Sequence, residues 1–507
     1  MPMSNSSPAH IAPIDILDDD SLLNIFYLYR PLLLGEDQDD DTRLAGGDKA
    51  WLGEHWWFNL AHVCQRWRNL ILGSCSYLGL CLVCTNGIHV ADILAYSPPL
   101  PLIIEWLYED SDIGTEHEWG LMLALEQRDR VRRIRLVVSI RDSQKLCTAI
   151  NEKFPILEYL IITSSDRSAA FILPEEFQAP HLHHIVLIGS ALPIRSQLLT
   201  ATVGLVTLCL IVDHPSIYFH PNILHQWLSF TPQLEVLVII FSSLVSNLEV
   251  EGELTRTPIT TQVTLPNLRW FAFQGDGAYS EALFRWISSP RLEKLQIFFF
   301  EQPTFSIPYL VQFMNMTKNL RFSSANFTFS DRQVDVEMYP HKGIDYAFRI
   351  GVICQHLDLQ IPFIAQIFSA LNRILSAVEH LALEHKEHSQ SSEEHDAANR
   401  SEWHKLLRSF GNVKTLRVDD RLSEQLSRCL QPDNGGLPWD LLPELRELTY
   451  AGNGNASDVF TSFIDARQNT GRPVSLVCRN TTHPSVPSFE PAAITSVNGE
   501  AGNNFNT

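Results

Sequence analysis

The sequence has little basic charge for its length. Its 507 residues include 38 Lys and Arg against 58 Asp and Glu, which gives a formal net charge of −20. A general nucleic-acid binder needs clustered basic residues to neutralise phosphates. The chain also lacks a run of the ~20 apolar residues that a membrane-spanning helix requires, because its longest apolar stretch, 234–248, contains Glu235 and several polar residues. We therefore expect neither a nucleic-acid-binding nor a membrane protein.

A disulfide framework and a secretory signal are also missing. The nine cysteines are scattered, and most lie inside apolar runs that read as strands. Residues 1–10 are polar and contain no apolar core of the kind that a signal peptide needs. Both features predict an intracellular chain with reduced thiols, in the cytoplasm, the nucleus or both.

The common catalytic signatures are absent: there is no Gly-x-Ser-x-Gly elbow, no Walker loop and no His-Glu-x-x-His. The segment 452–457 imitates a dinucleotide-binding turn, but Ser457 replaces its last glycine, so we interpret it as a loop that caps a helix. Five histidines lack the spacing that would place them on one helix face as zinc ligands. These are His380, His385, His388, His395 and His404. We predict no catalytic residue, no metal site and no cofactor.

What the sequence does have is a repeated pattern, apolar-x-x-apolar-x-apolar. Consecutive copies between Val131 and Leu292 begin 23 to 34 residues apart, close to the 20–29 period of leucine-rich repeats. Residues 298–377 interrupt the series, with room for two or three degenerate copies, one of them near 357–359. The copies begin at Val131, Leu157, Leu182, Leu205, Leu234, Leu268, Leu292, Val378, Val413 and Leu445.

Helix-like segments alternate with these strand-like copies, and several copies follow a proline that breaks the preceding element. This alternation predicts parallel strands stacked into a curved α/β solenoid over residues 73–479, with helices on its convex side. Further strands are expected at 78–84 and 100–106. The helix-like segments are 142–154, 221–230, 279–289, 362–377, 401–410, 421–430 and 457–467. The array resembles a divergent form of the leucine-rich repeats, without the asparagine of the strict pattern.

Ahead of the array, residues 13–72 predict a small helical module. Apolar residues recur at helical spacing in two segments, and an acidic insertion, 35–53, separates the segments. Asp18, Asp19 and Asp20 suit a helix N-terminus, and Pro31 ends the first helix. The apolar faces consist of Leu22, Ile25, Phe26 and Tyr29, then Trp56, Leu60, Val63, Cys64, Trp67 and Ile71.

Residues 14–26 and 60–70 together resemble an F-box, and the Val-Cys-Gln-Arg-Trp-Arg run at 63–68 is its most specific part. The chain departs from the family where Asp18, in place of a proline, follows Leu17, and in the insertion at 35–53. The resemblance implies docking onto a Skp-type adaptor that connects to a cullin-based ubiquitin ligase. The implied docking positions are Leu17, Leu22, Ile25, Phe26, Val63, Cys64 and Trp67.

The resemblance predicts a substrate-recognition subunit without catalytic activity, whose repeats hold a target protein. Two alternatives stay open. An aromatic residue at helical spacing, such as Trp67, is also typical of a protein core. The whole protein is alternatively a leucine-rich-repeat scaffold that does not bind the ligase. Residues 1–12 and the Asn/Ser/Thr/Pro-rich tail, 480–507, are expected to be disordered.

The target site is expected on the concave face of the strands. The three pattern positions point into the core between strands and helices. Side chains alternate along a strand, so the residues beside the middle position point to the concave surface. These flanking residues are basic at the start of the array and mostly apolar through its middle. An apolar strip of this kind is either a partner site or a surface covered by another segment of the chain. The residues we predict to bind the target are Tyr159, Ile161, His184, Val236 and Trp270.

Overall fold

The computed structural model describes residues 16–30, 56–85, 88–107, 115–165, 170–242, 261–317, 319–341, 345–354, 357–386, 396–431, 441–451 and 456–479. The predicted disordered ends, 1–12 and 480–507, and the acidic insertion, 35–53, lie outside these residues. The domain limits at 13, 72 and 479 therefore stay predictions.

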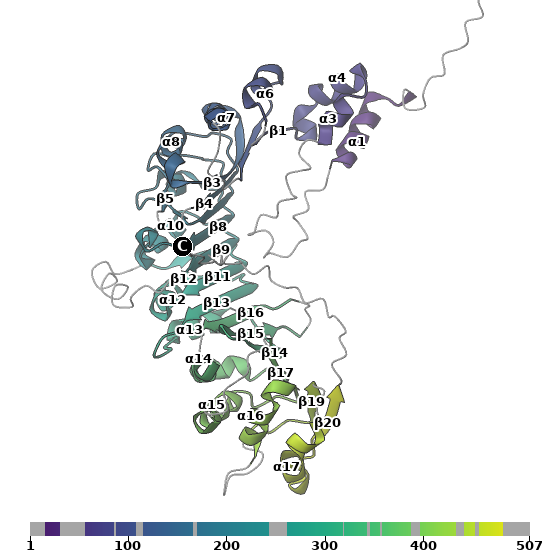
Figure 1. Ribbon diagram of the computed structural model, residues 1–507, viewed down its shortest axis with the longest axis vertical. Coiled ribbons are helices and arrows are strands. Elements are labelled where there is room, and N and C mark those ends of the chain that lie inside the picture. Colours follow the sequence, from purple (N-terminus) through teal and green to yellow (C-terminus); the bar gives the residue numbers. More distant parts are fainter. Residues whose placement is uncertain are drawn as a thin grey trace, which may run out of the picture.

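Sixteen of the described strands form one long, mostly parallel sheet. Figure 1 shows that this sheet curves, with its helices along the outer side. In spatial order the strands are β1 (Leu82–Thr85), β2 (Leu102–Trp106), β3 (Val131–Val138), β4 (Tyr159–Ser164), β6 (His184–Ile188), β8 (Thr207–Val212), β9 (Val236–Phe241), β11 (Trp270–Gly275), β13 (Lys294–Phe300), β16 (Phe348–Ile353), β15 (Gln333–Tyr339), β14 (Ser324–Phe329), β17 (His380–His385), β18 (Thr415–Asp419), β19 (Glu447–Ala451) and β20 (Ser475–Arg479).

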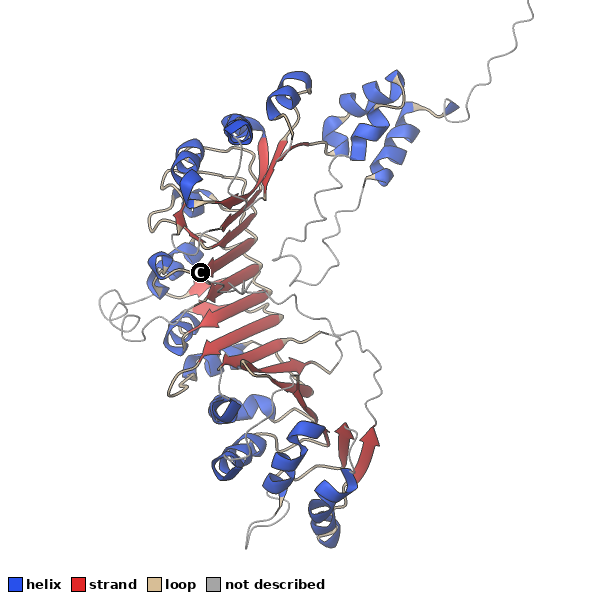
Figure 2. Cartoon of the chain, viewed as in Figure 1, coloured by secondary structure: helices blue, strands red, loops and turns tan. Residues whose placement is uncertain are grey.

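Helices connect most of these strands and cover the outer face of the sheet (Figure 2). Two short pairs of strands lie outside the main sheet, β5 (Phe171–Ile172) with β7 (Ser190–Ala191) and β10 (Val263–Thr264) with β12 (Ile287–Ser288). The helices of the array are α6 (Val90–Tyr96), α7 (Thr115–Glu126), α8 (Ile140–Ile150), α9 (Gln197–Ala201), α10 (Pro221–Ser229), α12 (Gly277–Phe284), α13 (Pro308–Met316), α14 (Leu357–Leu375), α15 (Asp396–Arg408), α16 (Asp420–Leu430) and α17 (Ala456–Asn469), with 3-10 turns at Arg128–Arg130 and Pro215–Ile217.

The repeated apolar pattern forms the core between the sheet and its outer helices. The three pattern residues of every copy are at most 2% exposed, for example Leu182, Ile185 and Leu187 at 0%. They pack in one cluster with helix residues such as Leu224 and Trp227 of α10. The predicted alternation of strands with outer helices is therefore confirmed, and the pattern correctly identified the side chains that face the helices.

The region 298–377 differs from the prediction of degenerate repeat copies. The chain leaves β13, passes α13 and enters β14 three places further along the sheet; it then returns through β15 and β16, and β16 pairs with β13. Strand β15 is antiparallel to both of its neighbours. The segment 357–359 is the start of α14 rather than a strand. Because β14, β15 and β16 are consecutive in the chain and pair antiparallel, this stretch is a meander inserted into a parallel sheet.

The N-terminal helical module consists of α1 (Asp19–Tyr29), α3 (Trp56–Ala61), α4 (Gln65–Gly73) and α5 (Cys75–Leu78). It joins the array at β1, where the indole N–H of Trp57 donates to the Cys81 carbonyl oxygen at 3.3 Å. The expected strand at 78–84 starts later, because α5 extends to Leu78 and β1 begins at Leu82. A turn through Gly79, at φ +62°, separates the two elements.

Candidate functional site

The first candidate surface lies on the N-terminal helical module. Asp18 caps α1 by accepting from the Ser21 N–H at 2.7 Å, and this hydrogen bond lowers the pKa of the Asp18 carboxyl. Arg66 of α4 joins the two helices, because its guanidinium donates to the Leu17 carbonyl oxygen and to Asp19 Oδ1 at 2.6 and 2.7 Å. Arg66 therefore links α4 directly to the start of α1.

The predicted adaptor-docking residues differ in burial: two are buried, two are half-buried and three are exposed. Leu22 and Phe26 are 0% and 1% exposed and form the core of the module, where Phe26 meets the Trp67 ring edge-on at a centroid distance of 4.8 Å. Ile25 and Val63 are 45% and 59% exposed. Leu17 and Trp67 are half-buried, and Cys64 is exposed. Cys64 Sγ accepts a hydrogen bond from the Trp67 N–H at the start of α4.

Large exposed apolar side chains concentrate on this module. Of the fourteen among the described residues, seven lie between Ile16 and Tyr77. Ile25, Leu28 and Tyr29 recur at i, i+3 and i+4 on α1, which places them along one face of that helix. Exposed apolar residues grouped on one face are typical of a surface that packs against a partner.

The second candidate surface lies on the inner face of the sheet, opposite the helices. Alternate residues of the strands from β4 to β11 form an apolar cluster that is separate from the main core. We call this cluster the apolar strip. Its buried members are Val186, Cys209, Ile211, Val238, Trp270 and Ala272, and its partly buried members are Ile161, Ile188, Val236 and Ile240.

Four of the five predicted target-binding residues form one row across this strip. In the strand register Tyr159 is opposite His184, and Val236 is opposite Trp270, with Thr207 between the two pairs. The Tyr159 and His184 rings stack at 4.4 Å and 8°. Ile161 lies in the next row, beside Val186. Trp270 is only 4% exposed, so it contributes more to the packing of the face than its aromatic type suggested.

The strip is closely packed because in-register side chains cover one another across neighbouring strands. Cys209 lies between its register partners Val186 and Val238 and is 0% exposed. Burial raises the pKa of the Cys209 thiol to about 12. At neutral pH this cysteine is therefore a small apolar side chain rather than a reactive one.

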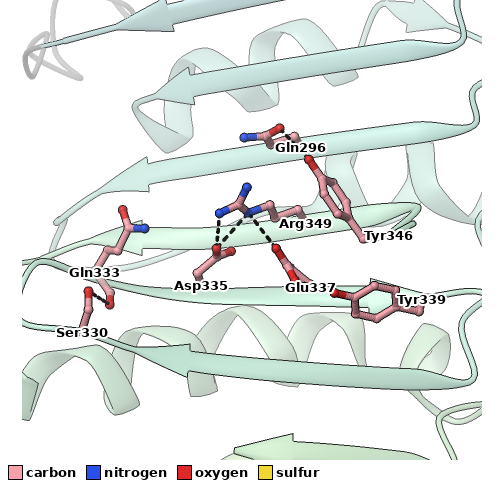
Figure 3. Close-up of polar contacts among 8 residues, drawn as sticks. All are labelled: Gln296, Ser330, Gln333, Asp335, Glu337, Tyr339, Tyr346 and Arg349. Atoms are coloured by element: carbon pink, nitrogen blue, oxygen red, sulfur yellow. Dashed lines mark hydrogen bonds and ion pairs between the residues drawn. The ribbon is translucent and has the colours of Figure 1, made fainter. Parts of the chain in front are cut away.

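A polar cluster follows the strip at the meander (Figure 3), and we did not predict it from the sequence. The Arg349 guanidinium Nε donates to Asp335 Oδ2 at 2.8 Å and lies 3.6 Å from Glu337 Oε1. Glu337 accepts from the Tyr339 hydroxyl, and the Tyr346 hydroxyl donates to Gln296 on β13. Burial raises the pKa of Asp335, and Arg349 only partly offsets this effect. Because the repeat pattern stops at 298, no sequence signal aligned these residues with the inner face.

Within the described ranges no three His, Cys, Asp or Glu side chains are grouped in a way that would hold a metal ion. His380 and His404, two of the five histidines considered, instead contact Thr415 and the Cys429 carbonyl oxygen. None of the described helices combines the length and the apolar character needed to span a membrane.

No protein-family model and no curated protein matches this chain. Among solved structures, it is similar to the leucine-rich repeat-containing protein LegL7 from Legionella pneumophila, with 9% sequence identity and a TM-score of 0.22 over 79% of this chain and 91% of that chain. A match at this TM-score adds no weight, so the fold assignment relies on the strand register and on the buried repeat positions. On that basis the chain has a leucine-rich-repeat-like α/β fold with a long, mostly parallel sheet.

Proposed function

We propose that this protein is a non-catalytic recognition subunit that brings a target protein to a cullin-type ubiquitin ligase. The inner face of the array binds the target, and the N-terminal helical module docks onto a Skp-type adaptor. The observation that carries the proposal is the half-exposed row of Tyr159, His184 and Val236, which borders the buried part of the apolar strip on the inner face. Aromatic and aliphatic side chains of this kind dominate the energy of protein interfaces.

The adaptor assignment draws its support from the F-box-like run at 63–68 and from the apolar surface around it. Ile25 and Val63 belong to the predicted docking set and stay accessible in the folded module, at 45% and 59% exposed. A helix that offers an apolar face to a groove or a second helix is a common mode of recognition. The ligase would supply the chemistry, and this subunit would contribute proximity.

The test uses two substitutions that separate the two surfaces. Val63→Asp introduces a charge into the adaptor surface, and Ile161→Asp does the same in the apolar strip. We expect Val63→Asp to lose the adaptor and keep the target set, and Ile161→Asp to show the reverse. Affinity purification of the full chain from cells, followed by mass spectrometry, measures both. Each loss should exceed about tenfold, because an apolar interface residue of this kind contributes about 2 kcal/mol.

The matched control is Val203→Asp, since Val203 is 66% exposed and lies outside both surfaces. It should retain the adaptor and the target set. If the wild-type chain captures no Skp-type adaptor but does capture targets sensitive to Ile161→Asp, the protein is a repeat scaffold independent of the ligase. If neither substitution changes any partner, both surface assignments are wrong.

A further inference from the structure

The row of target-binding residues ends at a lysine with an unusual environment. Lys294, the first residue of β13, is the register partner of Trp270. Its ammonium nitrogen lies 5.2 Å from the centroid of the Trp270 ring and 4.6 Å from that of Tyr346. Two aromatic rings therefore hold the cation in place through their π faces.

Within the described part of the chain, no carboxylate forms an ion pair with Lys294. Three other cations of the inner face do have a carboxylate partner: Arg135 pairs with Glu105, Arg349 with Asp335 and Arg417 with Glu384. An ammonium group carries three N–H donors, and the two aromatic faces satisfy none of them with an oxygen acceptor. The Trp270 indole N–H beside it is also buried without an acceptor among the described residues.

We infer that Lys294 binds an acidic side chain of an extended target segment whose apolar residues lie on the apolar strip. This inference rests on the proposed function and specifies the partner's chemistry. A carboxylate supplies an oxygen acceptor that neither aromatic ring offers, and a charged hydrogen bond held by an oriented donor is stronger than a neutral one.

The acid belongs to a side chain within the segment rather than to a C-terminus. Lys294 lies on the ninth of sixteen strands in the sheet, so the inner face continues in both directions and a bound chain can pass over it. Val236 is two strands away from Lys294, and Tyr159 is five strands away. At ~4.8 Å between strands and ~3.3 Å per extended residue, apolar anchors are expected about three and about seven residues from the acid.

The experiment is a selection of random dodecapeptides on the immobilised full-length chain. One library is displayed with its C-terminus fused to the coat protein, and a second has a free C-terminus. The wild-type chain should select Asp or Glu about three residues from an apolar residue in both libraries. Lys294→Met, which keeps the aliphatic stem, should lose the acidic preference, and Lys294→Glu should select Lys or Arg at that position.

Selected peptides synthesised with an amidated C-terminus should bind Lys294→Met about tenfold more weakly than the wild-type chain. The matched control is Lys145→Met on α8, the helix side of the array, which should bind as tightly as wild type, and circular dichroism should show both variants folded. If Lys294→Met keeps the acidic preference, or if only the library with free C-termini shows it, the inference is wrong.

Ile161→Asp separates this result from a failure of the proposed function. Apolar peptides that are lost in Ile161→Asp but show no acidic preference overturn only the role of Lys294. If no peptide selected by the wild-type chain is sensitive to Ile161→Asp, the inner face does not bind an extended segment, and the proposed target site and this inference both fail.

Discussion

The two halves of the inner face are built differently. From β4 to β11 every strand is parallel, and most inner-face positions hold aliphatic and aromatic side chains that cover one another. At the meander the order of the strands reverses, and buried charges take the place of apolar residues, with Asp335 and Arg349 at 6% and 8% exposed. On the inner face, the regular half therefore packs through apolar contacts between strands, whereas the reversed half buries an ion pair.

The largest expected effect concerns thiol reactivity in the regular half. Cys209 lies in the apolar strip with its pKa raised to about 12 by burial, whereas Cys64 on the N-terminal helical module is exposed. Since only the thiolate reacts, alkylation of Cys209 at pH 8 should be about a thousandfold slower than that of a cysteine with an ordinary pKa. Peptide mapping by mass spectrometry after timed alkylation checks this. Equal rates at the two cysteines would mean that the strip opens readily to solvent.

The second prediction breaks the ion pair of the reversed half. Asp335→Ala leaves Arg349 buried, with only the more distant Glu337 nearby. We expect a loss of about 3 kcal/mol in the free energy of unfolding, because an unpaired buried charge is strongly unfavourable. Denaturant titration measures it.

Two variants show whether the charge causes that loss. The double substitution Asp335→Leu/Arg349→Met should recover most of the stability, because an apolar pair can replace a buried ion pair. In the regular half, Val238→Ala removes a fully buried side chain of the strip but should cost only about 1.5 kcal/mol. A double variant as unstable as Asp335→Ala would indicate that packing, rather than charge, holds the meander together.

A third prediction concerns a close approach between two strands of the meander. A Cβ at Gly351 would lie 2.6 Å from the Val334 carbonyl oxygen and 2.6 Å from the Phe298 ring. Gly351→Ala should therefore destabilise the chain by about 2 kcal/mol, because the backbone of β15 has to move. Gly411→Ala, where a Cβ meets nothing within 4 Å, should change the thermal midpoint little. Equal midpoints for the two variants would show that β15 and β16 pair less closely than described.

Much of the array could be predicted because its repeats are local. Apolar residues at alternate positions of a strand, followed by a helix, indicate in the sequence which side chains face the core. In the copy that begins at Leu182, for example, all three pattern residues are fully buried. The same periodicity placed Tyr159, His184, Val236 and Trp270 on the opposite face. These four residues share one row because the strands pair in register, and the similar spacing of the copies made this register the expected one.

The meander could not be predicted in this way. Along its strands, polar and apolar residues alternate as they do in ordinary strands. No short motif indicates that β14 enters the sheet three places beyond β13. The partners Asp335 and Arg349 are 14 residues apart and meet only because β15 turns back against β16. The aromatic environment of Lys294 likewise depends on Tyr346, which lies between β15 and β16 within the meander.

By itself the sequence determined which residues face the core, where most outer helices lie and which residue types line the first half of the inner face. These properties depend on periodicity and on apolar burial, which act over a few residues. The tertiary structure decided the reversed strand order, the buried ion pair, the pairing of Trp270 with Lys294, and which F-box-like positions stay exposed, Ile25 and Val63 among them. Each of these depends on strand or helix neighbours that are distant in the sequence, and local sequence patterns do not indicate which distant elements become neighbours.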